Sequence, residues 1–586
     1  MSRHLDRVAI VVLAAALAVL PGIGAPALAQ TALAGRTTPG TRGGTLVVPQ
    51  RAELRTFNPV TALDAPSRDV LRRVMGDLVR INRATLATEP ALAESWTRSK
   101  DGRTLTVTLR SGLRFSDGQP CTADDVVFSF AVYLDEAVGS PQRDLLVVGG
   151  RPLDVRKIDA RRIAFTFAQP YAPAERLFDS VAILPRHKLE RIYRDGGLAK
   201  AWSTATAPAE IVGLGPFRVA EHVPGERTVL ERNPYYWRRD AAGTALPYLE
   251  RLVFVVVAND DAQAVRFQAG ELDLLTRITP ATAGALTQSM AGKARIVDAG
   301  PTLDFNFLFF NLTPVPTAAS PDVVARRGWF ADVRFRRAVA HAVDRPGMAR
   351  LVYQGKARPI WSLLSPANRP WYNTAIPERP RSIAGARAEL GAAGFTWRAG
   401  VLHDATGRPV RFTIAVAASN QQRQQMATIV QQDLAQLGMQ IDVVPLEFRA
   451  LLDRVTRTFD YDACVLGLAS GDADPAADVN VWKSSGPTHL WHPDQAAPAT
   501  PWEREIDQLM DQQFQTLDPA RRKALFDRVQ AIAHEHVAMV PLVTPHLLVA
   551  APPELGNLRP AALDHPTLWN ADELFWTTAR ARERRR

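Results

Sequence analysis

The sequence predicts an α/β protein that is built from more than one domain. Its 586 residues exceed the length of one ordinary domain and suggest about two to four domains. A hydrophobic content of 46% with 22% charged residues is that of a globular chain with a normal core. Segments with strand periodicity alternate with segments of helical periodicity, which is the order expected of α/β domains.

The first clear unit is the stretch from Ser99 to Phe130. After the turn pair Asp101-Gly102, apolar and polar residues alternate over residues 104–109, the pattern of a half-buried strand. A second turn leads to Thr122, which stands where a helix N-cap belongs and is followed by two acidic residues. The stretch predicts a strand, a turn and a capped helix, and it carries no chemistry.

The middle of the chain predicts further strands. Residues 217–223 and 228–231 form a hairpin across the Pro224-Gly225 turn. The continuous apolar run from Leu252 to Val257 is typical of a strand that is buried on both faces. Another strand is expected at Phe305–Phe310.

Helices and strands continue to alternate towards the C-terminus. Asp332 caps a helix, and a βαβ unit follows with its parts at 410–416, 421–437 and 440–444. A buried strand at 461–468 precedes two helices. Thr500-Pro-Trp-Glu503 forms a capping box at the first of these helices, and Asp518-Pro519 begins the second.

Distinctive motifs stand at Pro90 to Trp96, Leu113 to Phe130, Gly213 to Phe217, Asn233 to Trp237, Asp332 to Ala338 and Ala342 to Arg345. These motifs resemble those of the family 5 extracellular solute-binding proteins, the dipeptide- and oligopeptide-binding components of ABC importers. The resemblance implies the two-lobed α/β periplasmic-binding-protein fold with an extra domain in the first lobe, hinged lobes and a ligand in the interlobe cleft.

The resemblance also implies a division of the chain. The first lobe is expected to receive residues 43–59 and 206–299, with the extra domain at 60–205. The second lobe is expected at 300–490, and residues 491–586 are expected to return to the first lobe.

The N-terminus predicts export. Basic side chains precede an apolar run at 8–20, and Ala27-Leu28-Ala29 fits the small-x-small cleavage rule, so residues 1–29 are interpreted as a signal peptide. Residues 30–42 are interpreted as a flexible lead-in. We expect a periplasmic protein without a lipid anchor. The net charge is +10, but the basic residues are interspersed with acidic ones along the chain, apart from the basic tail that begins at Arg580. This distribution predicts no nucleic-acid partner.

Catalytic and metal-binding motifs are not apparent in the sequence. It contains neither a Gly-x-Ser-x-Gly elbow nor a P-loop, and no catalytic residue, metal site or cofactor is predicted. The spacing of His534 and His536 does not fit a zinc helix. His489 and His492 leave a metal complex open as an alternative ligand. Whether the only two cysteines, Cys121 and Cys464, pair stays open.

The main candidates for ligand binding are Asp472 and Asp474. Both follow a buried strand, and ligands usually bind beyond the carboxyl ends of strands in α/β folds. The resemblance implies that one of them pairs with the α-ammonium of a peptide. A surface turn rich in aspartate is the alternative interpretation, and Gly467-Leu-Ala469 stands where peptide binders commonly have a tryptophan.

Loop aromatics form the second group of candidates. Trp361 and Trp482 suit stacking on a ligand, and Phe57 and Asn58 fall where the family enters its cleft. The sequence thus predicts a non-catalytic, monomeric binding protein that delivers a small peptide or similar solute to the permease subunits of an inner-membrane ABC transporter. An oligosaccharide, nickel chelate, haem or opine ligand is the alternative on the same fold. A secreted hydrolase is the alternative from another class.

Overall fold

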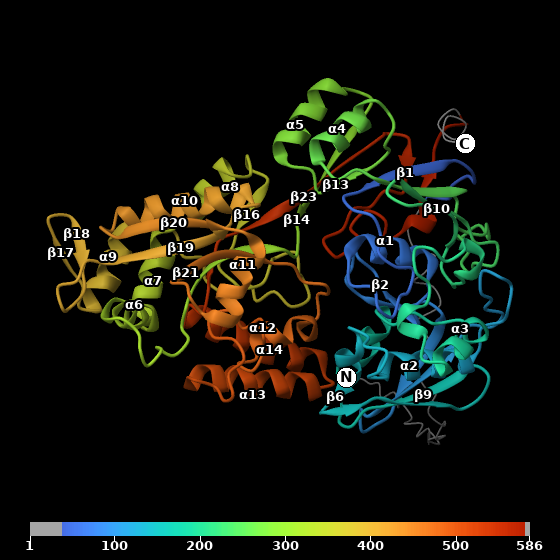
Figure 1. Ribbon diagram of the computed structural model, residues 1–586, viewed down its shortest axis with the longest axis horizontal. Coiled ribbons are helices and arrows are strands. Elements are labelled where there is room, and N and C mark those ends of the chain that lie inside the picture. The colour runs from blue at the N-terminus through green and yellow to red at the C-terminus, as the bar shows by residue number, and fades with distance from the viewer. Residues whose placement is uncertain (1–37, 580–586) are drawn as a thin grey trace, which may run out of the picture.

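The computed structural model describes residues 38–579 and shows two lobes joined by a narrow sheet (Figure 1). The blue, cyan and green N-terminal part forms one lobe, and the yellow and orange part of the chain forms the other. The predicted signal peptide lies outside the described residues. No helix in residues 38–579 combines the length and the apolar character that a membrane span requires.

The first lobe contains a mixed four-stranded sheet. Its strands follow the order β1, β12, β11 and β10, with β1 parallel to β12 and the other pairs antiparallel. The bounds are Thr45–Gln50 (β1), Arg251–Val256 (β12), Arg227–Arg232 (β11) and Phe217–Val223 (β10). The prediction of a strand at 252–257 buried on both faces is wrong for one face. Leu252 and Phe254 are buried, whereas Val253 and Val255 are only partly covered.

The extra domain of this lobe is built on a second, antiparallel sheet. Its strands are β4 (Ala93–Arg98), β5 (Thr104–Leu109), β9 (Arg162–Thr166) and β8 (Asp154–Lys157), in that order. Helix α2 (Ala123–Leu134) packs on it. Thr122 is the N-cap of α2 and forms a capping box with Asp125, as the sequence predicts for the cap.

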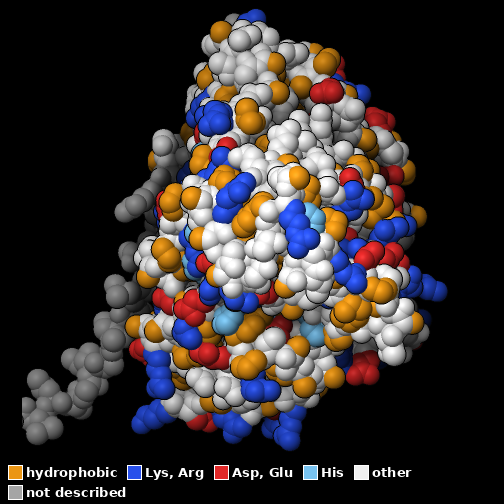
Figure 2. Space-filling model, turned by 90° about the vertical axis from the view of Figure 1, so that its left-hand side faces the viewer, with side chains coloured by type: hydrophobic (Ala, Val, Ile, Leu, Met, Phe, Trp, Pro, Cys, Tyr) orange, Lys and Arg blue, Asp and Glu red, His pale blue; other side chains and the backbone are white. Residues whose placement is uncertain are grey.

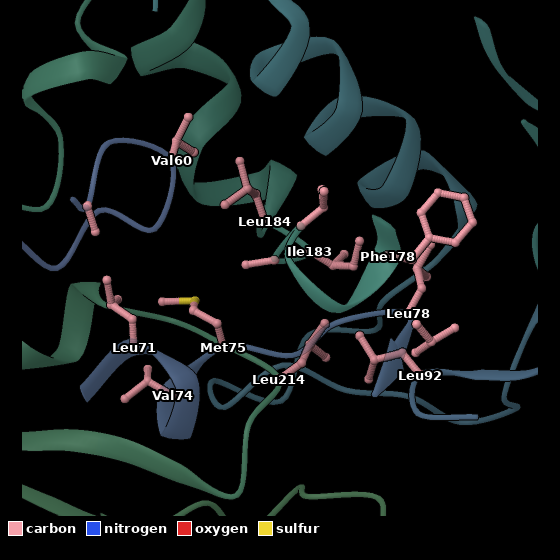
Figure 3. Close-up of a cluster of buried hydrophobic side chains, with 14 of the residues drawn as sticks. Val60, Leu71, Val74, Met75, Leu78, Leu92, Phe178, Ile183, Leu184 and Leu214 are labelled. Carbon is pink, nitrogen blue, oxygen red and sulfur yellow. The ribbon is translucent and has the colours of Figure 1, made fainter. Parts of the chain in front are cut away.

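Helix α1 (Ala65–Val74) is held in place by a buried hydrophobic core of the first lobe. Figure 3 shows Leu71, Val74 and Met75 in the same buried cluster as Leu184 and Leu214. The chain passes very close to the end of the helix. The amide of Gly215 donates to the carbonyl of Val74 over 2.8 Å, and a Cβ on Gly213 would lie 2.1 Å from the same oxygen. The Gly-Leu-Gly motif therefore serves close backbone packing.

The second lobe contains a five-stranded sheet. Its order is β20 (Gln440–Leu446), β19 (Arg411–Ala417), β21 (Ala463–Leu468), β15 (Phe305–Phe310) and β22 (Val540–Pro541). Strands β19 and β20 run parallel and are joined by α10 (Gln421–Ala435), which confirms the predicted βαβ unit. Every residue of β15 is buried, because helices cover both faces of the sheet.

Helices α13 (Pro501–Gln515) and α14 (Pro519–Glu535) also belong to the second lobe. Their caps are as predicted, with Thr500 and Glu503 forming the capping box and Asp518 capping α14. The assignment of residues 491–586 to the first lobe is wrong for these helices. Ile506, Met510 and Phe526 pack in one core with three phenylalanines of β15, which holds both helices on the second lobe; these are Phe305, Phe307 and Phe309.

The lobes are joined by two antiparallel strands. Strand β14 (Arg295–Pro301) pairs with β23 (Val543–Ala551), so the chain returns to the first lobe about fifty residues after the expected position near 490. Short strands β13 (Leu275–Thr276) and β16 (Ala357–Pro359) pair with the same β23. The remaining α-helices of the described residues are α3 (Arg186–Arg194), α4 (Asp260–Gln268), α5 (Pro280–Ser289), α6 (Pro321–Ala331), α7 (Val333–Ala342), α8 (Arg345–Leu351), α9 (Ile383–Ala392), α11 (Phe448–Asp453) and α12 (Val479–Trp482). The remaining short strands are β2 (Val79–Ile81), β3 (Thr88–Pro90), β6 (Val147–Val148), β7 (Arg151–Pro152), β17 (Thr396–Arg398), β18 (Val401–His403), β24 (Leu555–Gly556) and β25 (Phe575–Trp576).

The surface carries its positive balance in a dispersed form. On the face of the second lobe, basic, acidic and hydrophobic side chains are interspersed (Figure 2). On this face, the described residues form no large patch of a single charge sign.

Candidate ligand-binding site

A cavity of about 400 Å³ lies between the two lobes. The first lobe contributes α1, the segment around Pro59–Leu63 and the segment Tyr171–Ala182 to its wall. The second lobe contributes the loop after β21, with Gly471, Asp472 and Asp474. The volume falls within the range of about 300 to 1,000 Å³ that is usual for small-molecule sites.

Asp472 reaches across the cavity to the first lobe. Its Oδ2 accepts a hydrogen bond from Nε of Arg176 over 2.7 Å, and its Oδ1 accepts a second from Nη2. Nη1 of Arg176 donates to the carbonyl of Leu86 over 2.9 Å and to Oγ1 of Thr88 over 3.3 Å. This bidentate pair therefore links the lobes directly.

Asp474 is held inside the second lobe. Both of its oxygens accept hydrogen bonds from Arg522, each over 2.7 Å, and the two side chains are only 4% and 8% exposed. Oδ1 of Asp474 also accepts from the amide of Ala476 over 2.9 Å. The guanidinium of Arg522 lies 4.7 Å from the ring centroid of Trp371. The pair fixes the loop to α14 and is part of the framework of the site.

The wall on the first lobe contains a buried ionic network. Arg72 donates to Asp77 over 2.7 Å and contacts Asp179, which also pairs with Arg83. Burial raises the pKa of Asp77 to about 7 in spite of the neighbouring Arg72. His565 contacts Asp69, yet burial lowers the pKa of this imidazole. Each of these charges has a counter-charge within the first lobe.

Apolar side chains form much of the remaining wall. Leu63 and Leu145 are 70% and 44% exposed, and both line the cavity together with Leu71, Met75 and Leu177. Large apolar side chains at this exposure present surface that a ligand is able to cover.

The other predicted site residues lie elsewhere. Trp482 is fully buried and packs edge-on against Phe526 at 5.4 Å between ring centroids. Trp361 is half-buried and donates from Nε1 to the carbonyl of Arg379 over 2.8 Å. Phe57 is buried, and Asn58 donates to the carbonyl of Leu198 over 2.8 Å. None of these four lines the interlobe cavity among the described residues, and their contact with a ligand stays a prediction.

Sequence reasoning missed Arg176, Leu63 and Leu145. Arg176 lies 296 residues from its partner Asp472, and no local pattern signals such a pair. The exposed leucines carry a weak signal, because Leu63 stands in a loop and Leu145 in a short 3₁₀-helix, Arg143–Leu146, and exposed positions are more often polar.

His489 and His492 do not form a metal site. His489 is fully buried, with Nδ1 facing the carbonyl of Val481 at 2.9 Å and Nε2 facing Glu503 at 3.2 Å. Both ring nitrogens thus face acceptors within the chain, so neither is directed towards a metal site. Within residues 38–579, no three of the side chains that bind metals come together. Cys121 and Cys464 are buried, unpaired thiols.

Glu503 gives a testable dependence of stability on pH. Burial opposes ionisation, but hydrogen bonds from His489, Gln495 and Thr500 lower the pKa of Glu503 from 4.5 to about 2. A depressed pKa stabilises the fold above the unfolded value and loses that contribution as the pH falls through the folded value. We expect the stability advantage of the wild type over Glu503→Gln to shrink by about 3 kcal/mol between pH 5 and pH 2, measured by urea unfolding.

A neighbouring glutamate provides the control for this measurement. Glu505 lies on the same helix and pairs with Arg528, both about half exposed. We expect Glu505→Gln to show the acid dependence of the wild type, because exposed pairs contribute little. An unchanged pH profile in Glu503→Gln would show that another group governs acid unfolding.

Two α/β lobes with a cavity between them define a binding protein of the two-lobed kind. The family model of bacterial extracellular solute-binding proteins, family 5, matches residues 87–489, which is more than half of the chain. The chain therefore belongs to this family and is a solute-binding protein of the ABC-transporter type.

Individual relatives agree with this assignment. A protein of Deinococcus radiodurans named "Probable ABC transporter-binding protein" is 27% identical over 511 residues, covering 83% of this chain and 84% of that protein. The structure of the oligopeptide-binding protein AppA from Bacillus subtilis, in complex with a nonapeptide, matches with a TM-score of 0.68 at 22% identity, over 92% and 100% of the two chains. NikA from Brucella suis, in complex with Fe(III)-EDTA, matches with a TM-score of 0.75 at 23% identity, over 91% and 99%. These likenesses establish the fold and leave the ligand open.

Proposed function

We propose that this chain works in the periplasm, where it captures a small organic solute in the cavity between its lobes. It then delivers the solute to the permease of an ABC importer. The observation that carries the proposal is the composition of the cavity wall. It joins α1 and its neighbouring loops to the loop after β21, so a bound solute would contact both lobes. Hinge closure around such a solute would exclude water and create the surface that a permease recognises.

A binding role without catalysis is supported by the chemistry of the wall. Three of its carboxylates, Asp77, Asp472 and Asp474, are engaged in ion pairs with arginines within the chain. The described cysteines are buried, and burial raises the pKa of the Cys464 thiol, so it is a poor nucleophile. We propose a monomer that needs no cofactor. The size of the cavity suits a small peptide or a comparable solute.

The test compares the ligand-induced stabilisation of the wild type with that of a variant whose cavity is blocked. Thermal unfolding of the purified chain would be followed with peptides, oligosaccharides, metal chelates and lipophilic acids. A true ligand at about 100 times its Kd should stabilise the wild type by about 2.7 kcal/mol. Ala477 is exposed on the cavity wall of the second lobe, so we expect Ala477→Trp to abolish this stabilisation.

A matched substitution separates cavity filling from general damage. Ala262 is exposed on α4 and does not line the cavity, and Ala262→Trp should respond to the ligand as the wild type does. Equal stabilisation of the two tryptophan variants would place the ligand elsewhere and contradict the proposal. Turnover of a peptide or glycoside by the pure protein would favour the hydrolase alternative instead.

A further inference from the structure

Three of the four carboxylates that line the interlobe cavity among the described residues are paired with arginines of the chain. A ligand ammonium that enters a desolvated site needs a fixed counter-charge, and a paired carboxylate does not offer one. Among the described residues that line the cavity, the pairs are Asp77 with Arg72, Asp472 with Arg176 and Asp474 with Arg522. The fourth carboxylate, Asp564, is half exposed and lies 3.8 Å from the imidazole of His565.

Arg176 is the decisive member of this set. It comes from the first lobe and meets Asp472 at the end of the loop that the second lobe presents to the cavity. Its guanidinium also donates to Leu86 and Thr88, so its position is fixed from both sides. A ligand cation would have to displace Arg176 from Asp472, and the displaced guanidinium, which is largely buried, would lose its counter-charge.

The apolar part of the wall points to the rest of the ligand. Leu63 and Leu145 belong to the few large hydrophobic side chains of the described chain that are strongly exposed, and both line the same cavity. Pro59, Ala62 and Pro141 extend this apolar surface. A ligand that covers these side chains removes their surface from water, which favours binding in proportion to the area covered.

We propose that the cavity selects a solute with an apolar body and no cationic group, and that Arg176 is the residue that excludes cations. Arg176 pairs with the carboxylate of Asp472, where a ligand ammonium would otherwise bind. Leu63 and Leu145 contact the apolar body of the solute. This inference rests on the proposed function, since it names the class of solute that the same cavity takes.

The experiment uses three eight-carbon probes that differ only in their polar group. Binding of octanol, octanoate and octylamine to the full chain would be measured by isothermal titration calorimetry. We expect the wild type to bind octanol or octanoate at least tenfold more tightly than octylamine. Equal or tighter binding of octylamine would overturn the proposal.

Substitution of Arg176 should reverse the preference. Arg176→Gln frees the carboxylate of Asp472, so we expect the affinity for octylamine to rise at least tenfold and the affinity for octanol to stay unchanged. Arg369 is the matched control, because it also reaches the other lobe, where it donates to the carbonyl of Ala84 over 3.0 Å, without facing Asp472. Arg369→Gln should keep the wild-type order. An unchanged order in Arg176→Gln would show that Arg176 does not set the specificity.

A second variant keeps the test valid if Arg176→Gln does not fold. Leu145 is exposed, so Leu145→Asn should fold normally and bind octanol at least fivefold more weakly. Unchanged octanol affinity would remove the apolar contact from the proposal. If none of the three probes binds while a peptide or sugar stabilises the wild type and not Ala477→Trp, this inference fails and the proposed function stands. Failure of every compound in both assays would contradict the proposed function itself.

Discussion

Asp474→Ala is expected to lower the free energy of unfolding by about 3 to 5 kcal/mol, which is the usual cost of removing one partner from a buried ion pair. Arg522 would remain buried without its counter-charge, and the loop after β21 would lose its attachment to α14. Urea unfolding followed by circular dichroism would measure the change. We therefore expect the main role of Asp474 to be the stability of the fold. Its position in the sequence suggests contact with a ligand instead.

Two further variants define the origin of this effect. Asp474→Leu combined with Arg522→Met removes both charges, and we expect it to recover most of the lost stability because apolar pairs replace buried ion pairs at little cost. Asp472→Ala should cost less, since Asp472 and Arg176 are more exposed. An Asp474→Ala variant as stable as the wild type would show that the pair with Arg522 contributes nothing.

Arg238→Ala is expected to cause a comparable loss, because it removes the buried cation that pairs with Asp572 and Glu573, and among the described residues only Glu573 keeps a second arginine partner, Arg559. The buried guanidinium of Arg238 donates to Asp572 over 2.6 Å and also contacts Glu573. Tyr236 donates to the same Asp572 over 3.1 Å. Burial alone would raise the pKa of Asp572, but Arg238 together with Arg80 holds it below its usual value. We expect a loss of at least about 3 kcal/mol at pH 7, measured by urea unfolding.

The neighbouring Arg239 is the matched control for this prediction. It is exposed and donates to the carbonyl of Gly243 over 2.9 Å. Arg239→Ala should change stability by less than about 0.5 kcal/mol, as exposed substitutions usually do. Because protonation removes the uncompensated charge of Asp572, the deficit of Arg238→Ala should also shrink as the pH falls towards 4. A deficit that does not depend on pH would point to lost packing as its cause.

Local features of the fold could be predicted from the sequence, because their causes lie within a few residues. The N-caps Thr122 and Thr500 each act on an amide and an acidic side chain within three positions. The alternation at 104–109 likewise reports one strand with one buried face. The βαβ unit ending at β20 was predictable for the same reason.

Long-range contacts could not be predicted in this way. The apolar stripe of α13 shows that the helix is covered on one face, but it does not identify the sheet of β15 as the covering surface. A prediction from the sequence therefore places the return of the chain to the first lobe near residue 490, whereas the chain returns along β23. The loop of Asp472 and Asp474 was recognised from its position after a strand, whereas Arg176 and Arg522 are brought to it only by the tertiary fold.

The two strands that join the lobes have a mechanical consequence. Because β14 and β23 are hydrogen-bonded to each other, the lobes cannot slide along the strand direction without breaking that ladder. Bending and twisting of the ribbon leave the ladder intact. Its register is interrupted between Asp298 and Pro301, where Gly300 adopts a φ of 79°. We therefore expect the ribbon to bend and twist most easily at Gly300, so that the lobes rotate about that point.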